Sequence, residues 1–467
     1  MESVIIIVFV LGYLAITLEH NLKLDKLIPA LIMMAVCWAL VALGVDNFTQ
    51  WFDSSQHGLV DGFATMVHED KMHLVEETLL HHLGKTAEIL VFLLGAMTIV
   101  EIIDYFDGFA TIKGYVNFKS KKKLLWMFCI LAFVLSAIID NLTATIVLIS
   151  ILQKIVKKRE DRIWFAGLII IAANAGGAFS PIGDVTTTML WIGDKVSTGM
   201  LFTYLFIPSL LCMVVPAFLA TYLSAFKGDI EFDANEAEKP KNKHSARMLY
   251  LGLGAILFVP VFKTVTHLPP YVGMMLSLAV VATFAELYNN SKFSISTIEG
   301  GEADGQSLGA HHSPIHSALS KIEMPSILFF LGILMAVAAL ESLGILFNFA
   351  ESLKQGIPLM GSELAGTGVS DLVVILLGIG SAIIDNVPLV AASLGMFSEG
   401  LDDPLWHFIA FSAGTGGSML IIGSAAGVVA MGMEKIDFFW YFKKISWLAL
   451  VGFLVGSAAF VVLRMFV

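Results

Sequence analysis

The six residues Ser-Ala-Ile-Ile-Asp-Asn occur twice in this chain, at positions 136–141 and again at positions 381–386. Both copies lie inside long apolar stretches. A carboxylate at the depth of a lipid bilayer is costly, and by default it marks a functional site. The two identical copies place Asp140 and Asn141 in one stretch and Asp385 and Asn386 in the other, so they predict a duplicated ion site.

The composition indicates a polytopic membrane protein. The 467 residues are 57% hydrophobic and 14% charged, and apolar runs extend from end to end. The first run, residues 4–17, lacks the flanking pattern of a signal peptide, so we predict a short retained helix. The three cysteines are isolated, which argues against a disulfide framework or a metal cluster. The net charge of −11 lies largely in segments 229–238 and 299–304, which we interpret as solvated linkers.

Further membrane helices are predicted from the length of the apolar runs, since about 20 residues cross a bilayer. The candidates are residues 24–43, 89–106, 200–225, 248–265, 272–287, 327–347 and 445–466.

Lysines and arginines predict how the two Asp-Asn segments enter the membrane, because short cytoplasmic loops carry them in excess. Basic residues precede and follow the segment 124–152, so both of its ends should face the cytoplasm. This segment is too short for two spans, and we predict a re-entrant hairpin with its tip at Asp140 and Asn141. The second segment, 371–400, has acidic flanks and should enter from outside. The whole chain then has about ten spans, two hairpins and both termini outside.

The repeat extends beyond the hexapeptide. Phe92-Leu-Leu-Gly95 precedes the first copy and Phe329-Phe-Leu-Gly332 the second, and each glycine is followed nine residues later by an acid, Asp104 or Glu341. Glycine-rich stretches follow both copies in the same order. Three collinear matches indicate two related units, and the opposite hairpin entries make them inverted, as in secondary transporters.

We therefore predict an all-α polytopic membrane protein, an inverted-repeat secondary transporter with two re-entrant hairpins and two broken helices. The chain divides into N-terminal membrane helices with an outside loop (1–85), transport repeat 1 (86–226), linker loops with two membrane helices (227–322) and transport repeat 2 (323–467).

The glycine-rich stretches are the predicted helix breaks. Residues 174–184 hold three glycines and a proline, and residues 414–424 again combine glycines with hydroxyl side chains. A helix broken at this depth exposes carbonyl oxygens and N–H groups to an ion. Close helix packing explains the glycines equally well. It does not explain the carboxylate of Asp184, which we assign to the site together with Thr186, Thr187, Thr188, Ser418 and Ser424.

The residue types favour a cation. Carboxylate, amide and hydroxyl oxygens suit a hard cation such as sodium, and the tips and breaks hold no arginine or lysine for an anion. Asp140 and Asp385 are the leading charged ligands. Neighbouring buried carboxylates can retain protons near neutral pH, so sodium and protons would compete for the same oxygens. With alternating access, this competition produces antiport. Because the first unit has Asn174 and Asp184 where the second has Gly414 and Ser424, we expect most of the titrating groups in the first unit.

Other titratable residues allow two interpretations. Glu101 and Asp104 share a helix face and could form a proton relay, or they could lie at the aqueous end of their helix. Histidines at 57, 68, 73, 81 and 82 could sense pH, but their irregular spacing favours a solvated outside loop.

The paired Asp-Asn hairpins and the stretches 174–188 and 414–424 closely resemble the NhaD family of sodium/proton antiporters, in the ion transporter superfamily, over essentially the whole chain. Dicarboxylate carriers of that superfamily have Ser-Asn-Thr at the hairpin tips, whereas this sequence has aspartate, as NhaD does. The resemblance implies export of sodium, with lithium as a second cation, in exchange for protons. It also implies activity at alkaline pH, a homodimer with a moving transport part beside a fixed scaffold, and the inner membrane of a bacterium as the location.

The resemblance also assigns the ion-binding residues, with Na+ held chiefly by Asp140, Asp184 and Asp385. The complete set that it implies is Asp140, Asn141, Asn174, Asp184, Thr186, Thr187, Asp385, Asn386, Ser418 and Ser424.

Three other classes of function compete with antiport. A sodium-coupled carrier of a dicarboxylate or oxyanion would have the same fold but needs a basic or donor-rich pocket. A proton-translocating subunit of a larger complex would have charges along several consecutive spans. An enzyme ranks lowest, because no metal-binding His/Glu pair or nucleophile motif is present in the sequence. We expect no cofactor and no nucleic-acid partner; the expected partners are the transported ions and the lipid bilayer.

Overall fold

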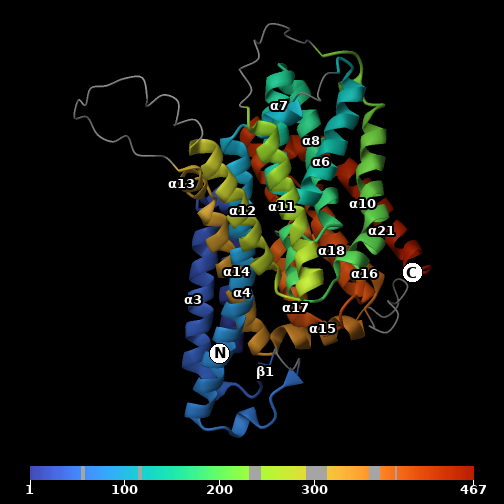
Figure 1. Ribbon diagram of the computed structural model, residues 1–467. Helices are drawn as coiled ribbons and strands as arrows, with labels where there is room; N and C mark the ends of the chain where they lie inside the picture. The colour runs from blue at the N-terminus through green and yellow to red at the C-terminus, as the bar shows by residue number, and fades with distance from the viewer. Residues whose placement is uncertain (54–57, 114–117, 231–242, 291–312, 357–368, 384–385) are drawn as a thin grey trace, which may run out of the picture.

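The protein is built almost entirely of helices, most of which run along one long direction of the molecule (Figure 1). The computed structural model describes residues 1–53, 58–113, 118–230, 243–290, 313–356, 369–383 and 386–467. Within these residues, the only sheet is the antiparallel pair β1 (Phe52–Asp53) and β2 (Gly58–Leu59). Eight of the described helices are long and apolar enough to cross a membrane. The all-α polytopic membrane fold is confirmed.

Each helix outside the hairpins and breaks covers one of the predicted spans, although α4 begins well before its predicted start. They are α1 (Glu2–Thr17), α3 (Leu27–Gly44), α4 (His68–Tyr105), α10 (Thr198–Ala220), α11 (Ser245–Thr266), α12 (Pro270–Asn290), α14 (Met324–Ser342) and α21 (Ser446–Leu463). Shorter helices connect them: α2 (Glu19–Leu22), α5 (Ala110–Lys113), α13 (Pro314–Leu319), α15 (Ile345–Gly356), α20 (Phe438–Lys444) and the 3-10 turns η1 (Val45–Asn47), η2 (Phe63–Thr65) and η3 (Ser224–Phe226).

Helix α4 is much longer than the sequence analysis predicted. It begins at His68, not near residue 89, and spans 38 residues. The histidines at 68, 73, 81 and 82 therefore lie on a helix, and their assignment to a loop was wrong; His57 lies outside the described residues. Polar residues hid this part of α4 from a search for apolar runs. The domain boundary predicted between residues 85 and 86 falls inside the helix.

The first Asp-Asn segment forms two helices, α6 (Lys121–Ile139) and α7 (Asn141–Ile155), with Asp140 at the turn. Both outer ends lie at the same end of the molecule, because Lys121 at the start of α6 forms an ion pair of 2.7 Å with Asp161, which follows α7. The chain thus enters, turns at Asp140 and returns. Helix α6 is long enough to cross the membrane completely, whereas α7 is shorter. Re-entry without a full crossing therefore stays a prediction.

The second segment forms α16 (Asp371–Ser381) and α17 (Asn386–Met396) at the opposite end of the molecule (Figure 1). Arg464, just after α21, pairs with Asp371 at 2.5 Å. Beyond α17, the backbone oxygen of Glu399 accepts a hydrogen bond of 3.0 Å from Lys195. Ile384 and Asp385 lie outside the described residues. The two helix pairs therefore enter from opposite ends, as an inverted repeat requires.

Both predicted helix breaks are present. Helix α8 (Arg159–Ala178) stops before α9 (Val185–Ile192), and α18 (Pro404–Gly416) continues through η4 (Gly417–Met419) before α19 (Ala425–Glu434). A Cβ atom on Gly176 would lie 2.1 Å from the backbone oxygen of Phe133, and one on Gly416 would lie 2.1 Å from that of Gly378. Glycine is therefore required where each hairpin crosses its broken helix.

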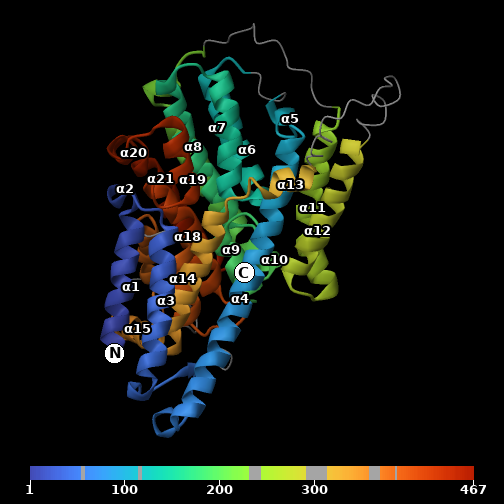
Figure 2. The same ribbon diagram turned by 90° about the vertical axis from the view of Figure 1, so that its left-hand side faces the viewer.

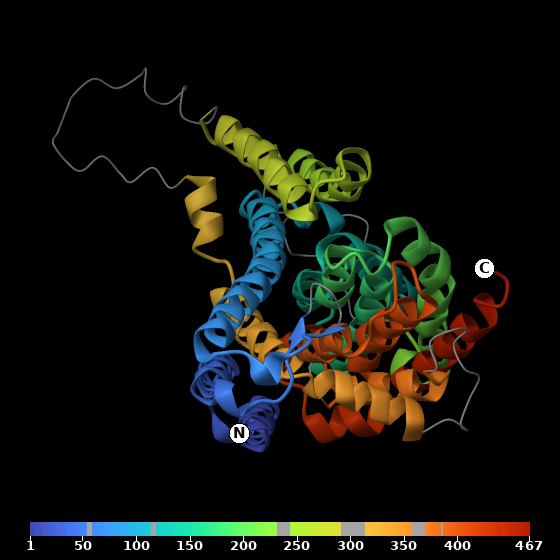
Figure 3. The same ribbon diagram turned by 90° about the horizontal axis from the view of Figure 1, so that it is seen from below.

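The remaining helices surround this crossing. Helices α1 and α3 lie on one side of α4, and α11 and α12 lie on the other (Figure 2). Seen from below, these two groups stand at different edges of the molecule, with the repeats beside them (Figure 3). Trp38 of α3 donates a 2.7 Å hydrogen bond to the backbone oxygen of Met335 in α14, while Lys263 of α11 donates one of 2.8 Å to that of Trp191 in α9.

Candidate functional site

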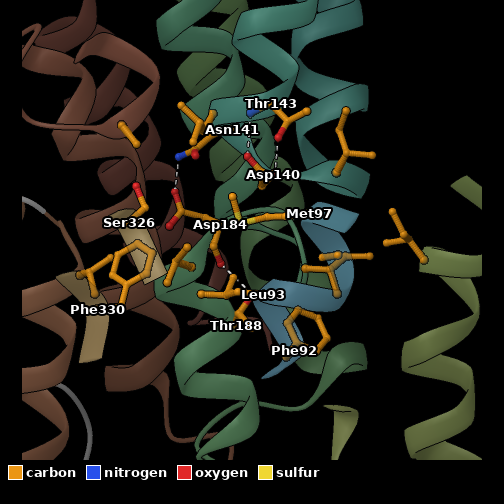
Figure 4. Close-up of a pocket in the computed structure, with 18 of the residues that line it drawn as sticks. Phe92, Leu93, Met97, Asp140, Asn141, Thr143, Asp184, Thr188, Ser326 and Phe330 are labelled. Atoms are coloured by element: carbon orange, nitrogen blue, oxygen red, sulfur yellow. Dashed lines mark hydrogen bonds between the residues drawn. The ribbon is translucent and has the colours of Figure 1, made fainter. Parts of the chain in front are cut away.

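A small cavity of about 80 Å³ lies where the first hairpin turn, the two helix breaks and the start of α17 meet, with α4 on its side. Most of its lining is apolar, including Phe92, Leu93 and Met97 of α4 (Figure 4). Its polar lining residues are Lys26, Asp140, Asn141, Thr143, Asp184, Thr188, Ser326 and Asn386. Such a volume holds a few water molecules or a partly hydrated ion, since one water needs about 10–15 Å³ of such space.

Asp184 is the centre of the polar contacts. It is 2% exposed and caps the N-terminus of α9, where its carboxylate accepts bonds of 2.9 Å and 2.7 Å from the N–H and hydroxyl of Thr186. Asn141, at the first hairpin tip, donates to it at 2.5 Å. Asn386, at the second tip, donates to it at 3.4 Å. One carboxylate thus gathers both tips.

Asn174 joins the two repeats beside that carboxylate. Its side-chain oxygen accepts a hydrogen bond of 3.0 Å from Asn141. Its amide nitrogen donates to the backbone oxygen of Ile170 at 3.0 Å and to the hydroxyl of Ser424 at 3.1 Å. Ser424 caps α19 in the second repeat, just as Asp184 caps α9 in the first. The helix breaks of the two units are therefore linked by a side-chain contact.

Asp140 lies at the first tip, in backbone geometry that residues other than glycine rarely adopt, with φ 87° and ψ 155°. Its two carboxylate oxygens accept bonds of 2.8 Å from the N–H of Thr143 and 2.8 Å from its hydroxyl (Figure 4). The sequence analysis did not single out Thr143. Its signal was the position three residues after an N-cap aspartate, where capping contacts are expected.

The predicted site residues fall into three groups. Asp140, Asn141, Asn174, Asp184, Thr186, Asn386 and Ser424 are linked around the cavity by the contacts above or line it. Thr187 and Ser418 are buried but do not line it: the Thr187 hydroxyl donates to the Ser180 oxygen at 2.8 Å, and that of Ser418 donates to the Thr415 oxygen at 2.7 Å. Asp385 lies outside the described residues.

Three further charged residues were placed relative to this cavity by the structure. Glu101, half-buried, and Asp104, exposed, lie farther along α4 and do not line the cavity. Lys26, just before α3, does line it, and its ammonium lies 4.4 Å from the centre of the Phe329 ring. Lys26 belongs to an N-terminal segment far in sequence from the tips and breaks, so no sequence pattern links it to them.

The donor set suits a transported cation. In the described part of the chain, no three His, Cys, Asp or Glu residues lie close enough to hold a metal ion. The cavity instead combines the carboxylates of Asp140 and Asp184 with the amides of Asn141 and Asn386. Oxygen ligands of this kind suit hard cations of low charge.

Comparison with known proteins places this geometry in context. The model of a family described as citrate transporter matches residues 6–406. Sodium/proton antiporter 2 of Arabidopsis thaliana is 37% identical over 98% of this chain and 99% of its own length. Sodium/proton antiporter 1 of the same plant is 40% identical over 97% of this chain and 71% of its own length. The Na(+)/H(+) antiporter NhaD of Alkalimonas amylolytica is 30% identical over 95% and 86%, respectively.

Proposed function

We propose a function on the premise that these matches establish: the chain belongs to the citrate transporter family, and to the family of the sodium/proton antiporters that it matches. It crosses a membrane several times and exchanges sodium ions for protons across it. The observation that carries this proposal is one buried cavity lined by Asp140 and Asp184 of the first repeat and Asn386 of the second.

The proposed mechanism is competition for carboxylate oxygens. An ionised carboxylate only accepts hydrogen bonds, and at Asp184 it faces the amides of Asn141 and Asn386. A sodium ion entering the cavity takes up oxygen lone pairs that a proton would otherwise occupy. On the other side of the membrane, protons bind the carboxylates again and displace the sodium ion, which leaves to that side and completes the exchange. Inverted repeats that meet at such a site let one part of the protein move against the other, which exposes the site to each side in turn.

The remaining residues of the set implied by the NhaD resemblance have supporting roles in this proposal. Thr186 fixes the Asp184 carboxylate, and Ser424 connects the second break to Asn174. Thr187 and Ser418 brace the backbone of the breaks, while Asp385 is proposed as the second-tip ligand from the sequence repeat. A proton relay through Glu101 and Asp104, transport of lithium, a homodimer and a bacterial inner membrane also stay proposals.

The test uses the purified full chain in sealed vesicles with an imposed pH gradient. The vesicles are made acidic inside. Addition of Na+ outside should cause protons to leave the vesicles and so dissipate the gradient, whereas addition of K+ should not. Asp140→Asn and Asp184→Asn, which keep the side-chain shape, should each abolish the response to Na+. Li+ is added in a separate arm. If both variants exchange Na+ for protons as well as the unchanged chain does, the shared-carboxylate mechanism is wrong.

A second candidate is a sodium-coupled carrier of a dicarboxylate or another oxyanion, for which the tricarboxylate citrate is the probe. Two observations favour it: the description of the matching family and the presence of Lys26 in the cavity lining. This carrier would take up labelled citrate down a sodium gradient, and Lys26→Gln would weaken that uptake because an ammonium attracts carboxylates. The same vesicles decide between the two candidates. Citrate uptake without sodium-driven proton movement would overturn antiport.

A further inference from the structure

The two hairpin tips carry the same hexapeptide but differ three residues after the aspartate. Position 143 in the first tip is threonine, and the equivalent position in the second, 388, is proline. Both residues lie in the first turn of the returning helix, α7 or α17. Proline is tolerated there because the first turn does not need its N–H group. The choice between threonine and proline therefore follows from what surrounds each tip, not from helix formation.

Thr143 contacts both oxygens of the Asp140 carboxylate. Its N–H donates to Oδ1 at 2.8 Å, and its hydroxyl donates to Oδ2 at 2.8 Å. Two donors from one residue fix both the position and the rotation of the carboxylate. A carboxylate has about four lone-pair sites, so the two Thr143 bonds do not exhaust its capacity to bind a cation. Figure 4 shows the pair side by side at the edge of the cavity, close to Asp184.

The backbone at Asp140 needs this support. Its φ of 87° and ψ of 155° lie in a region that is essentially reserved for glycine. Residues held there persist only where neighbouring contacts over-determine them, and such strain clusters at ligand sites. The two bonds from Thr143 supply that constraint and direct the carboxylate toward the cavity that Asn141 and Asp184 also line.

The second tip cannot reproduce this arrangement. Proline has neither an N–H group nor a hydroxyl, so Pro388 can donate no hydrogen bond at the equivalent position. Pro388 is buried. The first tip thus has a built-in device for orienting a carboxylate, and the chain omits it from the second tip although the preceding six residues are identical.

We propose that Thr143 is a positioning residue for sodium exchange, which holds the Asp140 carboxylate in the orientation that receives the ion. This inference rests on the proposed function, since it assigns Thr143 to the sodium-binding step of that exchange. The chemical class of ligand is a monovalent hard cation, and the contribution of Thr143 is made through Asp140.

The test compares three variants in the vesicle assay, with initial proton release measured over a range of Na+ concentrations. Thr143→Val removes the hydroxyl and keeps the shape, so the apparent KM for Na+ should rise about tenfold, the effect of losing one hydrogen bond to a charged group. The maximal rate should change much less. Thr143→Ser restores the hydroxyl and should restore the KM.

Thr145→Val is the matched control. Thr145 lies on the same helix, is fully buried, and its hydroxyl has no hydrogen-bond partner among the described residues. This variant should keep the KM of the unchanged chain. If Thr143→Val reduces the amount of folded protein recovered, Thr143→Ala replaces it in the comparison with Thr143→Ser.

The outcomes separate this inference from the proposed function. If the unchanged chain releases protons on addition of Na+ but Thr143→Val has the same KM, Thr143 is not a positioning residue and antiport stands. A serine variant as weak as the valine variant overturns the role of the hydroxyl in the same way. If the unchanged chain gives no Na+-driven proton movement at all, the proposed function itself fails.

Discussion

At the point where its broken helix resumes, the first repeat has Asp184, and the second repeat has Ser424 at the equivalent place. Both side chains cap the helix that follows, Asp184 by accepting from the Thr186 N–H at 2.9 Å and Ser424 by accepting from the Gly427 N–H at 3.2 Å. Only Asp184 also accepts from Asn141 and Asn386, at the two hairpin tips.

This comparison separates two requirements that the sequence repeat combines. The backbone of a broken helix needs a side-chain oxygen at the N-cap, and either residue type supplies one. The site needs a negative charge, and only one repeat supplies it at this position. The repeat is therefore symmetric in its backbone and asymmetric in its chemistry. Substitutions at equivalent positions should have unequal effects where charge matters and equal effects where only the backbone matters.

The largest effect is expected at the two caps themselves. Asp184→Ser gives the first repeat the cap of the second, so the helix should stay capped while Na+-driven proton release is lost, a fall of at least about 100-fold, as expected when a buried charged partner is removed. Ser424→Thr at the equivalent position keeps a hydroxyl cap and changes no charge, so its activity should fall far less than that of Asp184→Ser. Equal activities of the two variants in vesicles would contradict the asymmetry.

A smaller, equal effect is expected at the glycines of the two crossings. Gly176→Ala and Gly416→Ala each place a methyl group 2.1 Å from a backbone oxygen. Each should destabilise the fold by roughly 1–3 kcal/mol or more, because a packed backbone cannot move away freely. Gly380→Ala is the control, since a Cβ there has no atom within 4 Å. Thermal unfolding in detergent measures all three variants. Tolerance of only one crossing variant would argue against equivalent backbones.

The smallest effect is expected at the first residue of each hexapeptide. Ser136 donates to the Ala173 oxygen at 2.6 Å, and the Ser381 hydroxyl is shared between the Gly378 oxygen at 2.9 Å and the Ala413 oxygen at 3.2 Å. Ser136→Ala and Ser381→Ala should each lower stability by about 1 kcal/mol, the usual net contribution of one hydrogen bond.

Ser412→Ala is the matched control for the serine variants. Its hydroxyl is buried without a hydrogen-bond partner in the described part of the chain, so the variant should unfold at the temperature of the unchanged protein. A much larger loss for Ser136→Ala than for Ser381→Ala would show that the two hairpins are held differently.

The fold was largely predictable because its signals are local. Apolar runs predicted most spans, and clustered glycines, joined by a proline in the first unit, predicted both helix breaks. The length of α4 was missed, since its first part is polar and an apolar search starts near Ile89. Membrane re-entry of the hairpins, the four-segment division and the ion-binding roles stay predictions.

The candidate site was predictable by residue type but not by contact. The cluster of Asp140, Asn141, Asp184 and Asn386 around one cavity follows the repeat. Lys26, from a segment with no match in the repeat, joins its lining. Thr187 and Ser418 have the same hydroxyl chemistry as Thr186 and Ser424, yet their hydroxyls bond to backbone oxygens within the breaks. No rule of sequence spacing distinguishes the hydroxyls that contact the site residues from those that bond to the backbone.

By itself, the sequence determined that this is a helical membrane protein with a collinear repeat and two helix breaks, and that only the first break carries a carboxylate, Asp184. These properties depend on composition, backbone freedom and charge near helix ends, which each segment carries locally. The tertiary structure alone decided which distant polar atoms meet: Asn386 reaches Asp184 across 202 positions, and Asn174 reaches Ser424 across 250. Hydrogen bonds depend on distances of a few tenths of an ångström, and only the packing of the whole chain sets those distances.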